Sequence, residues 1–401
     1  MLTYLAARQA EADDPETDAE PGKILHETRS GELANLGLVP FRRYYGAIDS
    51  TPLFVGLAGA YLDRTGDLET IRRLAPALFR ALDWIERHGD RDGDGLIEYA
   101  RRRSDGLLNQ GWKDSDDSAF HADGRLAEGP IALVEVQGYA CAAYRAGARI
   151  ARALGRREKA AALEAAAEAL AARIDRRFWV EELGFYAMAL DGWKRPCAVR
   201  ATNAGHLLFS GAAAPGRAAR VAEAFASPAF FTGFGLRTAA ATEARYNPMS
   251  YHNGSVWPHD TALVATGLAR YSFKAEAARL LDGMLEAAAR MELRRLPELF
   301  CGFRRRWGAG PTLYPVACAP QAWAAAAPFG LLAAALGLSV DAAGGVIRLD
   351  RPRLPERLSE VRVSNVRVGR GAADIRLRRT GRKIAVDVLD RCGPVEVLVR
   401  L

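Results

Sequence analysis

The chain has 401 residues, of which 49% are hydrophobic and 26% are charged, and these proportions exclude a mostly disordered protein. Its formal charge is 55 − 48 = +7, but most basic residues are Arg scattered among Asp and Glu, so no nucleic-acid partner is expected. The N-terminus has no basic, apolar leader, and the five cysteines have no metal-ligand or disulfide spacing. We therefore expect a cytoplasmic protein without metal or cofactor.

Along the chain, apolar residues recur at intervals of three and four, which predicts a mainly α protein. Two kinds of helix alternate. Two-faced helices are expected around 68–85, 163–178 and 281–288, and more apolar helices around 51–63, 130–154, 200–211, 257–271 and 319–337. Between the first two helices, Gly66 and Asp67 are typical of a helix stop followed by a new N-cap. This alternation predicts helix pairs in which an inner helix is covered by an outer one.

The stretch 308–340 carries no charge and is long enough to cross a bilayer. It contains several prolines, and its apolar part is mostly Ala, so a buried helix is expected instead of a membrane span. From residue 341 onward, apolar and polar side chains alternate with period two, which predicts strands. We therefore expect a helical domain over 1–340 and a small antiparallel β unit over 341–401. Because exposed strand edges invite pairing with other chains, this unit should pack on the helical body.

Long loops between the helices carry the candidate chemistry, and the first covers residues 106–118. It places Trp112, Lys113 and Asp114 side by side, an arrangement typical of sugar sites, where the ring stacks on the sugar and the carboxyl acts on the glycosidic oxygen. Lys113 would lower the pKa of Asp114, whereas an acid catalyst needs it raised by burial or by a second carboxylate. Asp116 and Asp117 compete for the acid role, and a solvated acidic loop is the alternative.

Two loops further along hold the remaining candidates. Glu298 lies in a nearly apolar run, where a carboxylate is functional or has a raised pKa, unless an Arg pairs with it. Residues 247–260 suit recognition of a neutral polyol, or they merely cap the following helix. Their amide, imidazole and indole groups belong to His252, Asn253, Trp257 and His259. The spacing is not that of a zinc site.

Three smaller features complete the set. Asp49 precedes a helix, where it binds sugar hydroxyls or interacts with the helix N-terminus. Glu135 lies within an apolar helix and needs a partner, either a substrate hydroxyl or an Arg. The run Asp90-Arg-Asp92-Gly-Asp94-Gly resembles the start of a calcium loop, but its twelfth position is Arg101 where a bidentate Glu is needed, so a hydrogen-bonded turn is expected.

Taken together, these segments resemble the catalytic module of the bacterial amylo-α-1,6-glucosidase (glycogen-debranching type) family. The matches run in order along the chain: EPGKILHE (20–27), YYGAIDSTPLF (44–54), DRDGDGLIEYARR (90–102), NQGWKDSDDS (109–118), VEVQGYA (134–140), YHNGSVWPHD (251–260), RLPELFCGF (295–303) and YPVACAPQAW (314–323). The family is grouped with the six-hairpin glycosidases, so the resemblance implies an (α/α)6 toroid. It further implies an inverting hydrolase acting on an α-glucan or oligosaccharide, with Asp114 as acid and Glu298 as base.

The resemblance also implies a sugar subsite lined by a larger set of residues. These are Asp49, Trp112, Lys113, Glu135, Gln137, His252, Asn253, Trp257, His259 and Tyr314. Relatives carry an N-terminal β-sandwich and a first barrel segment that this sequence does not contain, so we expect the first hairpin to be missing or supplied by a separate chain. Two other readings stay open: a non-catalytic carbohydrate-binding or assembly subunit, and an inverting phosphorylase.

Overall fold

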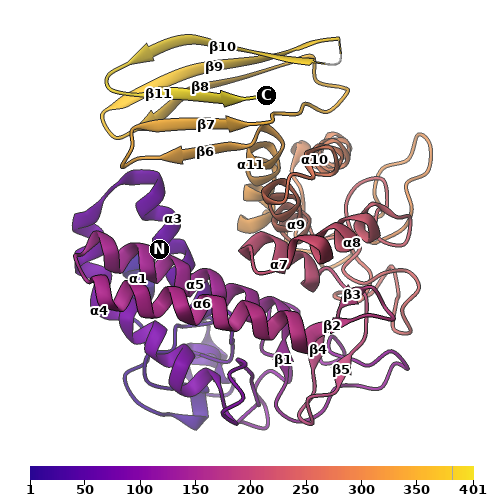
Figure 1. The fold of residues 1–401 in the computed structure, drawn as a ribbon. Helices are drawn as coiled ribbons and strands as arrows, with labels where there is room; N and C mark the ends of the chain where they lie inside the picture. Colours follow the sequence, from indigo (N-terminus) through magenta and orange to yellow (C-terminus); the bar gives the residue numbers. More distant parts are fainter. Residues whose placement is uncertain (382) are drawn as a thin grey trace. The chain divides into compact units, whose positions relative to one another are not determined.

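The structure is a computed structural model that describes residues 1–381 and 383–401 (Figure 1). Its chain divides into two compact units, which are described separately. Unit 1 comprises residues 1–62 and 67–214, and unit 2 comprises residues 63–66 and 215–401. Among the described residues, no helix is both long enough and apolar enough to cross a membrane. The charge-free stretch 308–340 instead contains a 15-residue helix.

Unit 1 is built mainly from helices, with a few two-residue strands. In chain order its elements are α1 (Leu2–Ala6), η1 (Pro15–Thr17), α2 (Glu32–Asn35), η2 (Pro40–Arg42), α3 (Ser50–Thr65, whose last residues belong to unit 2), α4 (Leu68–Trp84), η3 (Ile85–Gly89), β1 (Ala132–Leu133), α5 (Val134–Ala153), α6 (Arg157–Phe178), β2 (Trp179–Val180), β3 (Phe185–Tyr186), β4 (Ala189–Leu190), β5 (Pro196–Cys197) and α7 (Asn203–Ser210). The helix stop expected before α4 is confirmed, since Gly66 has a φ of 67° and the Asp67 carboxylate accepts from Thr70 N at 3.0 Å.

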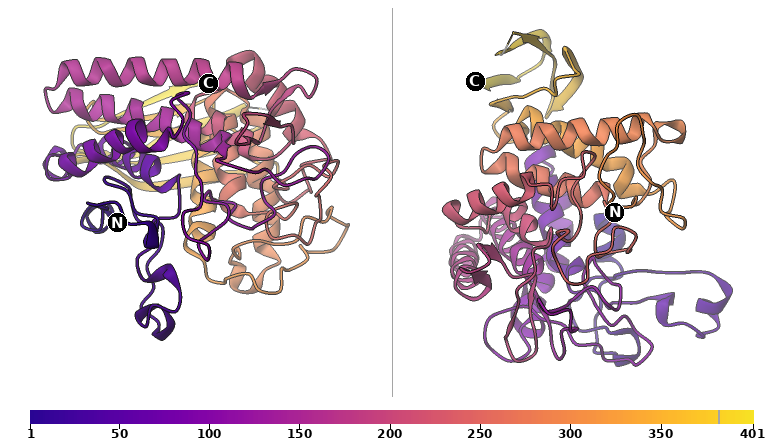
Figure 2. Two further views of the ribbon diagram at one scale, coloured as in Figure 1. Left: turned by 90° about the horizontal axis from the view of Figure 1, so that it is seen from below. Right: turned by 90° about the vertical axis from the view of Figure 1, so that its right-hand side faces the viewer.

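Helices α5 and α6 show the predicted pairing of an apolar and a two-faced helix. They run side by side in both Figure 1 and Figure 2. Most of α5 is buried, whereas α6 buries one stripe that includes Leu163, Leu170 and Ile174. Helix α5 also contacts α4 and α7. At Gly147 of α5 a Cβ atom would lie only 2.7 Å from Leu82 Cδ1, so close packing of α5 depends on the missing side chain.

A small sheet determines where the polar end of α5 lies. Strand β1 pairs with β4, and β4 pairs with β5, in antiparallel register. Because α5 begins at Val134, directly after β1, this sheet fixes the first turn of the helix and therefore the position of Glu135. In that turn a carboxylate also interacts favourably with the positive end of the helix dipole.

Unit 2 contains a second set of helices followed by strands. Its elements are α8 (Pro215–Ala226), α9 (Pro258–Arg270), α10 (Lys274–Ala289), η4 (Glu292–Arg294), α11 (Ala322–Leu336), β6 (Leu338–Asp341), β7 (Val346–Asp350), β8 (Glu360–Val368), β9 (Gly371–Thr380), β10 (Lys383–Cys392) and β11 (Glu396–Arg400). Helices α9, α10 and α11 contact one another. Helix α8 was not among the helices that the sequence pattern predicted, because its buried stripe consists partly of Ala, as at Ala218 and Ala222.

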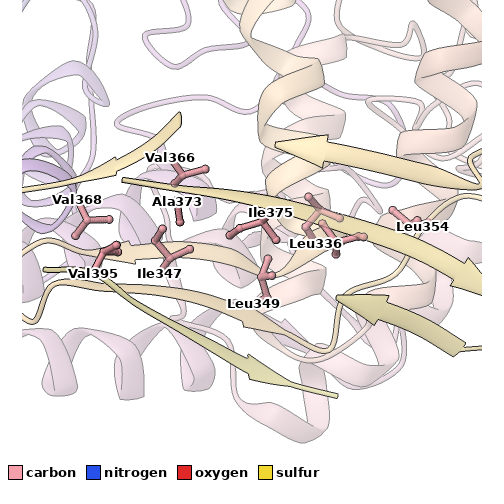
Figure 3. Close-up of a cluster of buried hydrophobic side chains, with 10 residues drawn as sticks. Leu336, Ile347, Leu349, Leu354, Val366, Val368, Ala373, Ile375 and Val395 are labelled. Atoms are coloured by element: carbon pink, nitrogen blue, oxygen red, sulfur yellow. The ribbon is translucent and has the colours of Figure 1, made fainter. Parts of the chain in front are cut away.

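The strands at the C-terminal end form two three-stranded sheets, with orders β10-β9-β8 and β11-β7-β6. All pairs in them are antiparallel except β7–β11, which is parallel. Their shared core includes Ile347 of β7, Val368 of β8 and Ile375 of β9, all at most 1% exposed (Figure 3). Leu336 at the end of α11 joins this cluster, so the strands pack on a helix of unit 2 as expected.

The packing of α6 on α5 generates a stability prediction. Replacing Leu163, which is 1% exposed, with Ala should lower the free energy of unfolding by about 2–5 kcal/mol, because apolar burial is lost and a cavity remains. Glu168 lies on the exposed side of the same helix, so Glu168→Ala should change it by less than about 0.5 kcal/mol. Urea unfolding of both variants measures the difference, and equal losses would contradict the two-faced packing of α6.

Candidate active site

The loop that carries Asp114 is fixed from within unit 1 by hydrogen bonds on both sides. Tyr99 Oη donates to Asn109 Oδ1 at 2.6 Å, and Asn109 Nδ2 donates to the Ser115 carbonyl at 2.7 Å. On the far side, Ser118 Oγ donates to the carbonyl of Lys113 at 2.6 Å. The half-buried Asp114 therefore lies on a short segment whose backbone is held at each end.

Two further carboxylates lie close enough to Asp114 to interact with it or with each other. Asp49 is 8% exposed and Glu135 is 0% exposed. The residue before Asp49 connects the start of α3 to the loop over residues 106–118, the acid loop, because Ile48 N donates to the Gln110 carbonyl at 2.8 Å. Burial raises the pKa of Asp49 to about 7, with further contributions from the charges of Glu135 and Asp114. Unit 1 thus holds three carboxylates in a cluster that disfavours full ionisation.

Cationic and amide groups close to Glu135 oppose the effect of burial on its pKa. Burial raises the pKa of Glu135, and Asn203, His206 and Lys113 work in the opposite direction. Lys113 is itself 5% exposed, and its Nζ donates to Asn203 Oδ1 at 2.7 Å. The sequence prediction paired Lys113 only with Asp114. In the structure the Lys113 ammonium also donates to the Asn203 amide and interacts with the charge of Glu135.

Trp112 is placed by contacts with the same group of side chains. Its ring stacks on His206, with centroids 5.9 Å apart and planes 9° apart. The Nδ1 atom of His206 is in turn hydrogen-bonded to the Tyr139 hydroxyl. Asn203, His206 and Tyr139 were not predicted as site residues. These residues could have been noticed as polar side chains within the apolar stretches 134–140 and 200–211, but the sequence does not show which side chain each of them contacts.

Other predicted residues of unit 1 differ in their surroundings. Asp116 is exposed and Asp117 is half-buried. Asp114 is less exposed than Asp116 and interacts with the charge of Asp49.

The amide of Gln137 bonds the backbone of Ile97 with both of its polar atoms. Its Oε1 accepts from Ile97 N at 2.8 Å and its Nε2 donates to the Ile97 carbonyl at 2.6 Å. These contacts give Gln137 a structural role in holding the segment that leads to Tyr99.

In unit 2, the carboxylate of Glu298 is fixed at both oxygens. Tyr251 Oη donates to Oε1 at 2.9 Å, and the backbone N–H of Cys318 donates to Oε2 at 3.1 Å. The backbone of Glu298 is tied to the same residue, since Glu298 N donates to the Cys318 carbonyl at 2.9 Å. The residue is 9% exposed. These contacts come from a hydroxyl and a backbone N–H and not from the Arg that the sequence left as an alternative, and the sequence did not predict Tyr251 as a partner.

The Tyr251 ring, whose hydroxyl donates to Glu298, packs among other aromatic rings. The Tyr251 ring contacts Trp257 edge-on at 4.9 Å and Tyr314 at 5.6 Å. His252 stacks on Trp257 with centroids 5.0 Å apart, and a second stacked pair joins His259 to Trp323 at 3.9 Å. His252 and Trp257 are each 1% exposed and pack against Tyr251, whereas Trp323 is 38% exposed and presents an indole ring to solvent.

The backbone explains how three distant segments of unit 2 meet at this point. Val256 and Phe300 exchange hydrogen bonds of 2.8 and 3.0 Å, and Phe300 also bridges Leu313. The buried Asn253 belongs to the same loop, and its carbonyl accepts from Asn247 N at 2.9 Å. The segments around 251–257, 298–303 and 312–318 therefore lie side by side and bring Tyr251, Glu298 and Cys318 together.

A pocket of about 590 Å³ opens beside Glu298, on the side of its chain neighbours. Pro297 and Leu299 line it together with Tyr314, and Arg290 and Arg295 contribute positive charge. Arg290 is bound to Glu286 at 2.7 Å, whereas Arg295 is exposed. The pocket has room for a sugar-sized group, and its lining carries both signs of charge, since Glu292 lies in it together with the two Arg residues.

Residues 46–308 match the family model of the mannosylglycerate hydrolase MGH1-like glycoside hydrolase domain. The chain belongs to this MGH1-like family of glycoside hydrolases. The matched range contains the carboxylates of both units, among them Asp49, Asp114 and Glu298. A comparison with curated proteins found no match.

Several solved structures share the fold of this MGH1-like chain. The GH63 mannosylglycerate hydrolase from Thermus thermophilus in complex with glucose is 19% identical with a TM-score of 0.58, over 82% of this chain and 86% of that one. A sialidase is 14% identical with a TM-score of 0.64, covering 86% of this chain. The GH78 family rhamnosidase of Bacillus sp. GL1 is 18% identical with a TM-score of 0.63, covering 90%.

The chain spans about a third of the length of the sialidase and the rhamnosidase, 32% and 33% respectively. These likenesses confirm the predicted fold class, mainly α and of the (α/α)6 toroid type. The family match agrees with the broader functional prediction, a glycoside hydrolase.

The raised pKa of Asp49 predicts how stability depends on pH. Since the pKa is about 7 in the folded chain and about 3.9 in an unfolded one, the folded state holds more protons between these values. Stability of the wild type should therefore fall as pH rises from about 4 to 7, by at most about 1.4 kcal/mol per pH unit from this group. Asp49→Asn should remove that part of the slope.

Urea unfolding of wild type and Asp49→Asn across this pH range measures the effect. Asp116→Asn is the matched control, because Asp116 is an exposed carboxylate of the acid loop and its loss should leave the slope unchanged. If the free energy of unfolding changes with pH in the same way for wild type and Asp49→Asn, the raised pKa of Asp49 is contradicted.

Proposed function

We propose that the chain is an inverting glycoside hydrolase that removes terminal glucose from α-glucans, with a preference for α-1,6 linkages. The observation that carries the proposal is Glu298, a little-exposed carboxylate whose two oxygens are each held by one donor. Two hydrogen bonds orient this carboxylate, and no ion pair of Glu298 occurs among the described residues, as a general base requires. The α-1,6 preference rests on the resemblance of the sequence motifs.

Asp114 is the proposed general acid. Its proton passes to the glycosidic oxygen as the bond from that oxygen to the anomeric carbon breaks. An acid catalyst must hold its proton near neutral pH, and neighbouring carboxylates favour the protonated form. The interaction of Asp114 with Asp49, which is itself buried near Glu135, supports this role.

Glu298 is the proposed general base. A water molecule attacks the anomeric carbon from the face opposite the leaving group, and Glu298 takes one of its protons as the new C–O bond forms. Inversion of configuration follows, because the incoming oxygen and the leaving oxygen occupy opposite faces. The mechanism requires the two carboxylates to lie ~6.5–9.5 Å apart, leaving space for the water.

A second candidate is hydrolysis of a small glycoside whose other half carries a carboxylate. The family description names a mannosylglycerate hydrolase, and a glycerate group is an anion. The exposed Arg295, which lines the pocket beside Glu298 together with Glu292, favours this candidate. Guanidinium groups bind carboxylates well because two N–H donors match two oxygens.

The test is glucose release from panose and isomaltose, compared with release of sugar from mannosylglycerate and glucosylglycerate. We expect activity on the α-1,6-linked substrates, reduced about 10²–10⁴-fold in both Asp114→Asn and Glu298→Gln because each removes one proton transfer. Asp116→Asn is the control and should retain activity. Unchanged activity in Asp114→Asn or in Glu298→Gln would reject the role of that residue.

The same assay separates the other readings. Turnover of the two glycerate glycosides alone would favour the second candidate. Activity that appears only with added inorganic phosphate, and that yields a sugar phosphate, would indicate a phosphorylase. A folded chain that binds the sugars but converts none of them would be a carbohydrate-binding subunit.

Tyr251 gives a further prediction about the base. Tyr251→Phe removes only the hydroxyl that donates to Glu298, so kcat should fall about 10–100-fold while KM changes little, as expected for one hydrogen bond to a charged group. Tyr246→Phe is the control on the same loop, because its hydroxyl donates over a long distance of 3.5 Å to the Gly302 carbonyl and has no contact with Glu298 in the described structure. Equal rates for wild type and Tyr251→Phe would show that Tyr251 does not position the base.

A further inference from the structure

The loop that resembles the start of a calcium site brings its three Asp side chains together. Atoms of Asp90, Asp92 and Asp94 that could each bind one cation lie within 4.8 Å of one another. Each carboxylate uses at least one oxygen to accept a backbone N–H within the loop. Asp90 accepts from Gly93 and Gly95, both at 2.8 Å. These contacts explain the turn but leave Asp92 Oδ2 and Asp94 Oδ2 for another partner.

That partner is an ammonium group from elsewhere in unit 1. Lys194 Nζ lies 3.0 Å from Asp92 Oδ2 and 3.3 Å from Asp94 Oδ2, and it donates to Glu98 Oε2. Three carboxylates therefore surround one ammonium group, and Asp94 contributes through an ion pair, since its Oδ2 atom has no hydrogen-bond partner in the described structure. Burial works against the charged amine, but Glu98 and Asp92 outweigh it and raise the pKa of Lys194.

The burial of Glu98 is an observation independent of the acidic turn. It occupies the ninth position counted from Asp90, one of the ligand positions in a calcium loop. It is 2% exposed, and its Oε1 atom has no hydrogen-bond partner in the described structure. A charged carboxylate this buried is stabilised by a cation close by, and the Lys194 ammonium supplies one.

The turn that carries Lys194 is built to present this side chain. Lys194 lies between β4 and β5 with a φ of 61°, a left-handed conformation that is uncommon for residues other than Gly, Asn and Asp. Asp191 holds the turn by accepting from Trp193 N at 3.0 Å and Arg195 N at 2.8 Å. The side chain of Lys194 is only 15% exposed, so it is directed inward and not into solvent.

We propose that the Lys194 ammonium is a built-in replacement for a divalent cation, so that the loop over residues 90–98 is held without a metal and becomes a Ca²⁺ site when this amine is removed. The ligands left behind would be the carboxylates of Asp92, Asp94 and Glu98, hard oxygen donors of the kind that Ca²⁺ prefers.

This cation position is connected to the acid loop through named contacts. Glu98 precedes Tyr99, whose hydroxyl bonds Asn109, which in turn bonds the backbone of Ser115. Ile97 is held by both ends of the Gln137 amide. Loosening the loop over 90–98 should therefore disturb the residue next to Asp114, without any change to the carboxylates themselves.

The experiment compares thermal unfolding of wild type and Lys194→Asn with added Ca²⁺ and with EDTA. Asn is chosen because it is neutral, shorter than Lys and tolerant of the left-handed conformation. Wild type should have the same Tm in both conditions. Lys194→Asn should unfold at lower temperature in EDTA and gain about 2–4 °C when Ca²⁺ is added. Calorimetric titration should give this variant a Kd between about 10 μM and 1 mM for Ca²⁺.

Two controls make the result specific. Lys159→Asn also removes one lysine from unit 1, where it pairs with Asp83 at 3.6 Å, and should gain no response to Ca²⁺. Adding Asp94→Asn to Lys194→Asn should abolish the response. If Lys194→Asn is insoluble, refolding with and without Ca²⁺ replaces the melting curves, and a higher yield with Ca²⁺ is expected.

Two results would overturn the proposal. One is a wild type whose Tm rises in Ca²⁺ and falls in EDTA, because the metal would then bind with the lysine present. The other is Lys194→Asn that neither binds Ca²⁺ nor gains stability or refolding yield from it. Both readouts are independent of the substrate, so they do not depend on the proposed function.

Discussion

A carboxylate that is removed from water must be protonated, hydrogen-bonded or paired with a cation, and much of this structure follows from that constraint. Asp49 meets it by a raised pKa. Glu298 meets it with two hydrogen-bond donors, one of them a backbone N–H. Glu98 meets it with the ammonium of Lys194. The three solutions differ in chemical consequence: the first favours holding a proton, the second orients an anion that can take one, and the third fixes the backbone.

The helices matter chiefly because they place these groups at defined points. Glu135 lies in the first turn of α5, which the strand pair β1–β4 holds in position, and Asp49 lies directly before α3. In unit 2 the carboxylate is not on a helix at all. Bridges between Val256, Phe300 and Leu313 bring Glu298 to its donors. Rigid elements thus carry the loops, while the loops carry the chemistry, as is common in enzymes.

The sequence predicted those features that depend on local pattern. The helix periodicity, the Asp67 cap and the strands after residue 341 all follow from neighbours within a few residues. Glu135 and Glu298 were found because charged residues in apolar runs are unusual, and Asp114 because it lies beside Trp112 in a long loop. Contacts between distant positions could not be predicted in this way: nothing local to Tyr251 indicates that it faces Glu298, 47 residues away. For the same reason Gln137 was expected to bind substrate, although its amide bonds the backbone of Ile97.

The proposed inverting mechanism, with Asp114 as acid and Glu298 as base, is tested most directly by the stereochemistry of the product. Proton NMR of the reaction with isomaltose, recorded before the sugar ring equilibrates, identifies the first anomer of glucose released from the non-reducing end. The account predicts β-glucose from this α-linked substrate, because water attacks opposite the leaving group. Release of α-glucose as the first product would contradict it, since retention requires a covalent intermediate and a different role for Glu298.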